Sequence, residues 1–65
     1  MTKKELVKKA IQNGFVIDEE EGRIRIKGKT KDVTIWPNGK ATRNDLDYTL
    51  VKYMTIKETN KYLFN

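Results

Sequence analysis

Residues 22–42 read GRIRIKGKTKDVTIWPNGKAT, and apolar side chains alternate with polar ones through the strand-like parts of this stretch. Such a two-residue period is typical of β-strands whose two faces meet different surroundings. One face of the expected sheet takes four aliphatic side chains: Ile24, Ile26, Val33 and Ile35. The other face takes Arg23, Arg25, Lys27, Thr34 and Trp36. The sequence therefore predicts a small sheet with one aliphatic face and one cationic face that carries a single aromatic ring.

The composition limits the class of protein that can contain such a sheet. The chain has 65 residues, no cysteine and a formal net charge of +5. This length suffices for one small domain, so we expect residues 1–65 to form a single basic domain. The lack of cysteine excludes disulfides and thiolate metal sites, and it favours a reducing, cytoplasmic location. No apolar run reaches the length of a signal peptide or a membrane span, so we expect no membrane association.

The charge is distributed unevenly along the chain. The net charge is +3 over residues 1–14, −4 over residues 15–21, +6 over residues 22–43 and zero over residues 44–65. The positive excess thus lies in the first segment and in the central stretch. Clustered positive charge favours nucleic acid, acidic proteins or anionic surfaces as partners.

The first segment has the pattern of an amphipathic helix. Thr2 and Glu5 form the Thr-x-x-Glu pattern of a reciprocal helix cap, and Asn13-Gly14 is typical of a helix end. Between them, an apolar stripe recurs at helical spacing, made of Leu6, Val7, Ala10 and Ile11. We therefore expect a helix from Thr2 to Asn13.

Strands and turns follow this helix. We expect strands at Phe15–Asp18, Arg23–Lys27 and Val33–Trp36, with Lys40–Arg43 as either a short fourth strand or a return segment. The turns between them are predicted at the acidic run Asp18–Glu21 with Gly22, at Gly28–Lys31 and at Pro37–Gly39.

The last part of the chain predicts one or two helices. Asn44 or Asp45 can cap the first, whose apolar face would carry Leu46, Leu50, Tyr53 and Met54. Thr55 and Glu58 repeat the capping pattern, so a second short helix, Ile56–Phe64, can follow after a bend. Whether these segments form one bent helix or two is left open by the sequence.

The fold class that follows is α+β: an N-terminal helix, a three-stranded antiparallel meander with a possible short fourth strand, and C-terminal helical segments packed on the aliphatic face. The expected core consists of Leu6, Val7, Ala10, Ile11, Phe15, Ile17, Ile24, Ile26, Val33, Ile35, Leu46, Leu50, Met54 and Leu63.

The chain lacks the residues that most enzymes use. It contains no histidine, cysteine or serine, and so neither the usual general base nor the commonest nucleophiles and metal ligands. Asp45 and Asp47 lie where carboxylates serve a helix start, and the run Asp18–Glu21 does not have the alternating spacing of a calcium loop. We therefore predict a non-enzymatic protein with no metal site, catalytic residue or cofactor.

Two segments resemble parts of known families. The order helix–three strands–helix resembles the small HicA-type toxins that act on mRNA. The resemblance includes Lys4-Glu5-Leu6 at the opening of the first helix and Gly14-Phe15 directly after it. The catalytic histidine of that family has no counterpart here, so its activity is not implied. Thr55–Glu58 through Tyr62-Leu63 resembles the first helix of excisionase-type DNA-binding domains. Each resemblance covers only a fraction of the chain, and we assign no family from the sequence.

The leading functional hypothesis is nucleic-acid binding through the cationic sheet face. Guanidinium and ammonium groups would meet phosphates while an exposed indole stacks on a base. The candidate residues are Arg23, Arg25, Lys27, Lys29, Lys31, Trp36, Lys40 and Arg43. A polar outer sheet face is also what any two-layer domain shows, and the choice between DNA and RNA stays open.

The alternative hypothesis is a protein-binding adaptor or inhibitor. Small phage or mobile-element proteins that block a host or defence factor are of this class, and the size, composition and lack of catalytic residues suit it equally well. Trp36, beside the sharp turn at Pro37, is the candidate anchor, because tryptophan is enriched among residues that dominate interface energies. The oligomeric state is not determined by the sequence.

Overall fold

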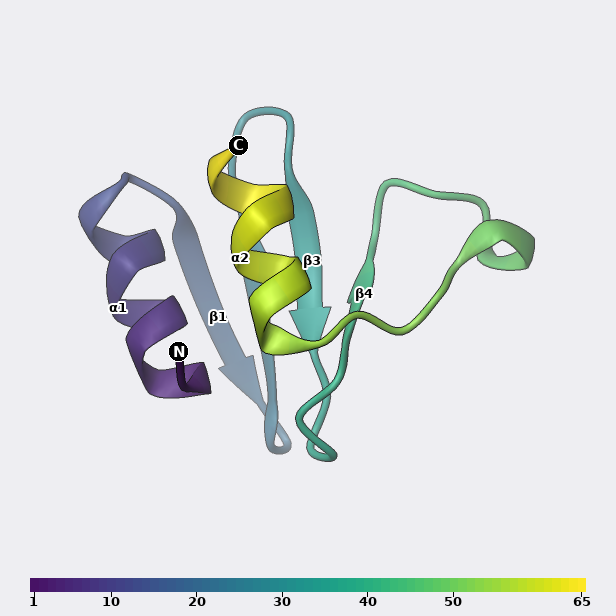
Figure 1. Ribbon diagram of the computed structural model, residues 1–65, viewed down its shortest axis with the longest axis horizontal. Helices are drawn as coiled ribbons and strands as arrows, with labels where there is room; N and C mark the ends of the chain where they lie inside the picture. The colour runs from purple at the N-terminus through teal and green to yellow at the C-terminus, as the bar shows by residue number, and fades with distance from the viewer.

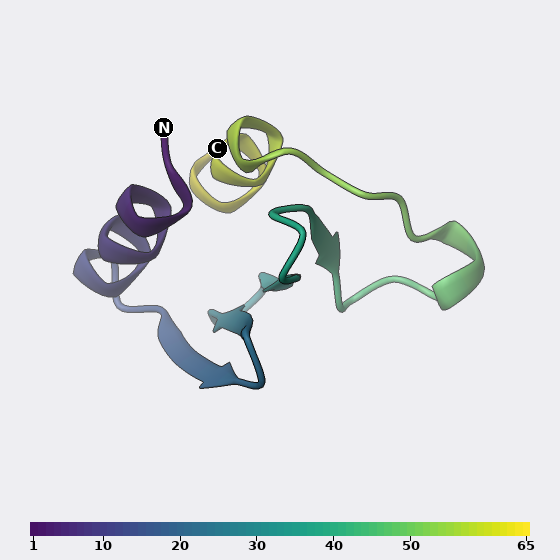
Figure 2. The same cartoon turned by 90° about the horizontal axis from the view of Figure 1, so that it is seen from below.

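The computed structural model describes all residues, 1–65, and confirms the α+β fold class. A four-stranded antiparallel meander in the order β1-β2-β3-β4 lies behind two helices, which cover one of its faces (Figures 1 and 2). The elements are α1 (Lys3–Gln12), β1 (Val16–Glu20), β2 (Arg23–Lys27), β3 (Asp32–Ile35), β4 (Ala41–Arg43), a 3₁₀ turn η1 (Tyr48–Leu50) and α2 (Ile56–Phe64). The optional fourth strand is therefore present.

The core is built on cross-strand pairs of branched aliphatic side chains. Ile24 of β2 lies opposite Ile35 of β3, and Ile26 lies opposite Val33. Alternation along the strands turns all of them toward the helices, where Leu6, Ala10 and Leu63 complete the buried cluster. The predicted aliphatic face is therefore the buried face of the sheet.

Both helices begin as the sequence predicts. The Thr2 hydroxyl accepts a hydrogen bond from the Glu5 amide at 3.2 Å, and the Glu5 carboxylate accepts one from the Thr2 amide at 2.8 Å. Thr55 and Glu58 repeat this exchange at 3.1 and 3.0 Å. Each cap satisfies two amides that a helix start otherwise leaves without a partner, which stabilises short helices in a domain with a small core.

The first hairpin differs from the expectation. The predicted turn over Asp18–Glu21 is wrong, because β1 continues to Glu20, which pairs with Arg23. The turn consists of Glu21 and Gly22 alone, with φ of 51° and 80°. Two consecutive residues with positive φ match the right-handed twist of the flanking strands. Three carboxylates that were expected at a hairpin tip are therefore strand residues.

The segment before α2 also differs. The predicted helix beginning at Asn44 or Asp45 is absent, and residues 44–54 form an arm that projects from the body and contains only the turn η1 (Figures 1 and 2). The arm returns to the sheet where Met54 exchanges both backbone hydrogen bonds with Ala41, at 2.9 and 2.7 Å. These bonds hold Met54 in an extended conformation, so a helix cannot continue through it. Only the second of the two possible C-terminal helices forms.

The core list is correct except at the arm and at the rims of α1. Ile11 and Leu50 are 58% and 63% exposed, and Leu46 is partly buried but lies outside the cluster. Val7, Phe15, Ile17 and Met54 pack against the cluster without being fully covered, and Ala41 is a buried member that the prediction missed. All other expected core residues are buried.

We expect Ile26→Ala to reduce the free energy of unfolding by about 2–5 kcal/mol, because Ile26 is fully buried and its truncation leaves a cavity. Ile11→Ala is the matched control, since most of that side chain is already in water. Chemical denaturation of both variants measures the difference. Equal losses would contradict the described core.

Candidate nucleic-acid interface

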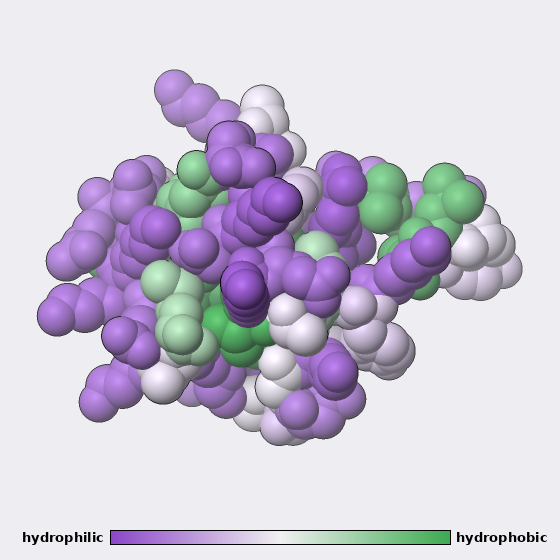
Figure 3. Space-filling model, viewed as in Figure 1, coloured by the Kyte–Doolittle hydropathy of each residue, from purple (hydrophilic) through white to green (hydrophobic).

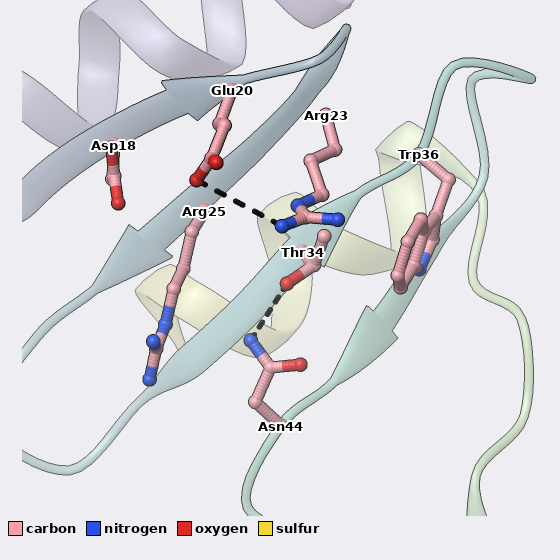
Figure 4. A pocket seen from close by; sticks show the side chains of 7 residues that line it. All are labelled: Asp18, Glu20, Arg23, Arg25, Thr34, Trp36 and Asn44. Carbon is pink, nitrogen blue, oxygen red and sulfur yellow. Dashed lines mark hydrogen bonds and ion pairs between the residues drawn. The ribbon is translucent and has the colours of Figure 1, made fainter.

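The outer face of the sheet carries the residues that the alternation predicts. Arg23, Arg25 and Trp36 line a shallow hollow of about 360 Å³ on this face, together with Asp18, Glu20, Thr34 and Asn44 (Figure 4). Lys27 continues the same side of β2 beyond the hollow, opposite Asp32 in the register. The structure thus brings together three of the eight candidate residues in one depression.

This face is not cationic, because β1 supplies carboxylates to it. Asp18 lies opposite Arg25 and Glu20 lies opposite Arg23 in the β1–β2 register. The Glu20 carboxylate approaches the Arg23 guanidinium to 3.8 Å (Figure 4). Arg25 makes a two-bond contact with Asp32, at 3.1 and 2.7 Å. Three cations therefore face three carboxylates, and the expected single sign of charge is absent.

Asp32 organises the centre of the outer face. Besides Arg25, it accepts a hydrogen bond from the Asn44 side-chain amide at 2.9 Å, and Asn44 also donates to Thr34 at 2.8 Å. The bonds from Arg25, and next those from Asn44, hold the pKa of the Asp32 carboxyl below its ordinary value against the opposing effect of burial. These bonds connect the end of β4 to β3. They therefore stabilise the sheet whether or not a ligand binds to this face.

Trp36 is partly buried rather than freely displayed. Its Nε1–H donates to the Thr42 hydroxyl at 2.8 Å, which fixes the indole over the outer side of β4. The ring stands at the rim of the hollow, with Arg23 and Thr34 beside it (Figure 4). A fixed, partly open indole has the geometry of a stacking platform, although its polar edge is already satisfied within the protein.

The other candidate residues lie elsewhere. Lys29 is exposed in the turn after β2, and Lys40 is exposed in the turn before β4. Lys31 and Arg43 lie on the helix side of the sheet, where each places its cationic group 4.4 Å from the centroid of the Tyr62 ring. Arg43 shares this side because it pairs with the buried Val33. The eight candidates therefore do not form one surface.

The remaining charge is strongly one-sided. Outside the balanced outer face, the protein keeps eleven of its fourteen cations and six of its nine acidic residues, and one of these six, Glu19, is on the helix side because it pairs with the buried Ile24. Six of these cations are on the helices: Lys3, Lys4, Lys8, Lys9, Lys57 and Lys61. The helices thus carry the largest share of the positive charge outside the outer face, while Lys29, Lys40 and Lys52 lie in turns and in the arm.

Four of those six acidic residues, all but Glu19 and Glu21, have hydrogen-bond partners within the protein. Glu5 and Glu58 cap the helices, and Asp47 accepts from the Thr49 amide at 3.1 Å. Asp45 makes a two-bond contact with Arg43, at 3.0 and 2.7 Å. Hydrogen bonds with Thr2, Arg43, Thr49 and Thr55 lower the pKa values of Glu5, Asp45, Asp47 and Glu58 respectively. Apart from Arg43, none of the eleven cations forms an ion pair.

Sequence reasoning missed Lys57, Lys61 and Tyr62 as candidate residues. Their signal was available, because two lysines four residues apart lie one above the other on a helix, and Thr55 and Glu58 already predicted that helix. The acidic side chains of β1 neutralise the outer sheet face. Only because of this is the helix side the more positively charged of the two.

No three acidic side chains lie close enough together to hold a metal ion. Neither helix has the length and apolar character needed to cross a bilayer. The chain matches no protein-family model, no curated protein and no solved structure.

The low pKa of Asp32 predicts a pH dependence of stability. A carboxyl whose pKa is lowered by folding adds stability above its unfolded pKa, about 3.9, and this contribution is lost as the pH falls through the folded value. We expect Asp32→Asn to lower the melting temperature at pH 7 and to make the further fall below pH 4 shallower. Glu19→Gln is the control, since that carboxylate has no hydrogen bond or ion pair. A wild-type acid profile for Asp32→Asn would refute this role.

Proposed function

We propose that the protein is a small non-enzymatic nucleic-acid-binding protein of the cytoplasm whose main contact surface is the helix-bearing side. The observation that carries this proposal is the excess of cations outside the outer sheet face, where eleven cations stand against six acidic residues and four of those six accept hydrogen bonds within the protein. A surface of this kind is attracted to the closely spaced charges of a phosphate backbone and releases counterions from it on binding.

The helices present their lysines in a repeated arrangement. Lys4 and Lys8 are exposed on α1, and Lys57 and Lys61 are exposed on α2, each pair one turn apart. The helices run in the same direction (Figure 1), and the Lys9 ammonium joins them by a hydrogen bond to Asn60 at 3.0 Å. Two parallel rows of ammonium groups on one layer suit contacts to successive phosphates.

The outer sheet face is the weaker candidate surface. Its arginines lie beside carboxylates that would also face an approaching phosphate, and Arg25 is held by Asp32. Trp36 could still stack on an unpaired base there. Binding through the outer face and binding through the helix side therefore predict different affinities for the same nucleic acids.

Paired variants separate the two faces. We expect Lys8→Gln combined with Lys57→Gln to weaken binding to duplex DNA, single-stranded DNA and RNA, and to lower the slope of log affinity against log salt by about two. The matched control, Arg23→Gln with Lys27→Gln, also removes two charges and should change the slope less. Fluorescence anisotropy at several salt concentrations gives both numbers.

A larger effect of the Arg23 and Lys27 pair would place the contact on the outer face, as the sequence alone suggested. No binding of any of the three nucleic acids at micromolar protein and low salt would refute the proposed function.

The arm favours a second candidate, the protein-binding adaptor or inhibitor. Tyr48, Leu50 and Tyr53 are 87%, 63% and 67% exposed within six residues. All three belong to the arm, and Figure 3 shows hydrophobic surface at the projecting end of the molecule. Large exposed aromatic side chains on a projecting segment are suited to filling a pocket on a protein partner. They are better anchors than Trp36, which is partly buried and already bonded to Thr42.

For this candidate we expect Tyr48→Ser with Tyr53→Ser to abolish capture of a specific partner from a nuclease-treated lysate of the host, without lowering the melting temperature. Trp36→Ala should retain the partner. Capture that depends on nucleic acid, or that survives the arm variant, would count against the adaptor hypothesis.

A further inference from the structure

The hollow on the outer sheet face is small and balanced in charge. Its volume is about 360 Å³, and its lining holds two carboxylates and two guanidinium groups. Ligand sites in proteins measure roughly 300–1,000 Å³, so this hollow has room for one small, neutral group rather than for a phosphate backbone. We propose that it binds a guanine base, either that of free guanosine or an unpaired guanine of a nucleic-acid strand. The strand form rests on the proposed function, whereas the binding of guanosine does not.

The strand register sets the side chains of the hollow in two rows. Glu20 of β1 pairs with Arg23 of β2, and Trp36 lies on the other side of Arg23, one residue beyond the last pair of β2 with β3. Figure 4 shows the Arg23 guanidinium between the Glu20 carboxylate and the indole. The second row consists of Asp18, Arg25 and Thr34. A carboxylate, a guanidinium fork and an aromatic ring therefore stand in sequence along one row.

The Trp36 ring supplies a surface on which a base can stack. Its Nε1–H donates to the Thr42 hydroxyl at 2.8 Å, which fixes the orientation of the ring. No aromatic ring or cation of the protein stacks on the indole. Stacking alone does not select a base, because every base has a π-face.

Hydrogen-bonding groups of both kinds remain unused around the hollow. Arg23 makes no hydrogen bond, since its approach to Glu20 is 3.8 Å, and Asp18 has no partner either. Asn44 donates its amino group to Asp32 and Thr34, at 2.9 and 2.8 Å, so only its side-chain oxygen is left. Figure 4 shows this oxygen directed to the side of Trp36. The hollow thus offers a free guanidinium fork together with free acceptors.

This set of groups matches guanine better than the other bases. Guanine presents two adjacent acceptors, O6 and N7, which fit a guanidinium fork, and two adjacent donors, N1–H and the N2 amino group, which fit a carboxylate. Arg23 and Glu20 supply this fork and this carboxylate, and they lie close enough together for one base to reach both.

The other bases lack one half of this match. Adenine is read by an amide that donates and accepts at once, and Asn44 cannot do so because its amino group is already used. Cytosine and uracil each present a single donor group to the carboxylates.

The fluorescence of Trp36, the only tryptophan of the chain, reports occupation of the hollow. We expect saturable quenching by guanosine with an affinity about tenfold above that of adenosine, cytidine and uridine, as one two-bond contact gives. Arg23→Lys keeps the charge but lacks the fork, so it should abolish the preference, and Glu20→Gln should do the same from the donor side of the base. Lys27→Gln, on the same face beyond the hollow, should leave the preference unchanged. Melting temperatures equal to that of the wild type would show that the variants are folded.

Two short single strands that differ only in one central base, guanine or adenine, separate the two sources and the two hypotheses. Tighter binding of the guanine strand would assign the hollow to bases in strands, and a preference seen only with guanosine would assign it to the free nucleoside. Guanosine binding with no binding of either strand would refute the proposed function and leave the site standing. Equal affinity for the two strands, with equal quenching by all four nucleosides, would overturn the guanine site and leave nucleic-acid binding intact.

Discussion

The structure depends on one constraint, the burial of the aliphatic pairs that join β2 to β3. Ile24 with Ile35 and Ile26 with Val33 face the helices, where Leu6, Ala10 and Leu63 cover them. Alternation along the strands then fixes the position of every charged neighbour: Arg23, Arg25 and Lys27 are directed outward, and Arg43 is carried inward beside Val33. The distribution of charge over the two sides of the protein is thus a consequence of packing the core.

The carboxylates in this protein serve mainly internal purposes. Two cap helices, one caps the turn η1, and two are held by arginines in contacts with two hydrogen bonds each. A core of eight buried apolar residues leaves little stability to spare in so small a domain, so these local bonds matter. Because the carboxylates are bound by backbone amides and arginines, none of them forms an ion pair with a lysine. Stability and surface charge are therefore linked in this chain.

The sequence predicts what local chemistry determines and misses what long-range pairing determines. The capping pairs at Thr2 and Thr55, the buried face of β2 and the turn at Pro37 follow from neighbouring residues. The extent of β1 does not, because a run of acidic residues favours a turn by composition, whereas pairing with β2 extends it as a strand. The arm is similar: apolar residues at helical spacing predict a helix, but Met54 pairs with Ala41, which lies on a different element. For the candidate site, the number of cations follows from the sequence. The net charge on each side of the sheet does not, because it depends on which carboxylates lie beside those cations.

The two edges of the sheet differ in how they meet the solvent. At β4, Met54 of the returning arm pairs with the backbone of Ala41, so the open edge is closed at the first residue of this strand. At β1, the free edge carries Asp18, Glu19 and Glu20 in succession. Two copies that approached through β1 would bring six carboxylates together, and this repulsion opposes growth of the sheet from one molecule to the next. The charge of this strand thus disfavours pairing of two sheets through their β1 edges.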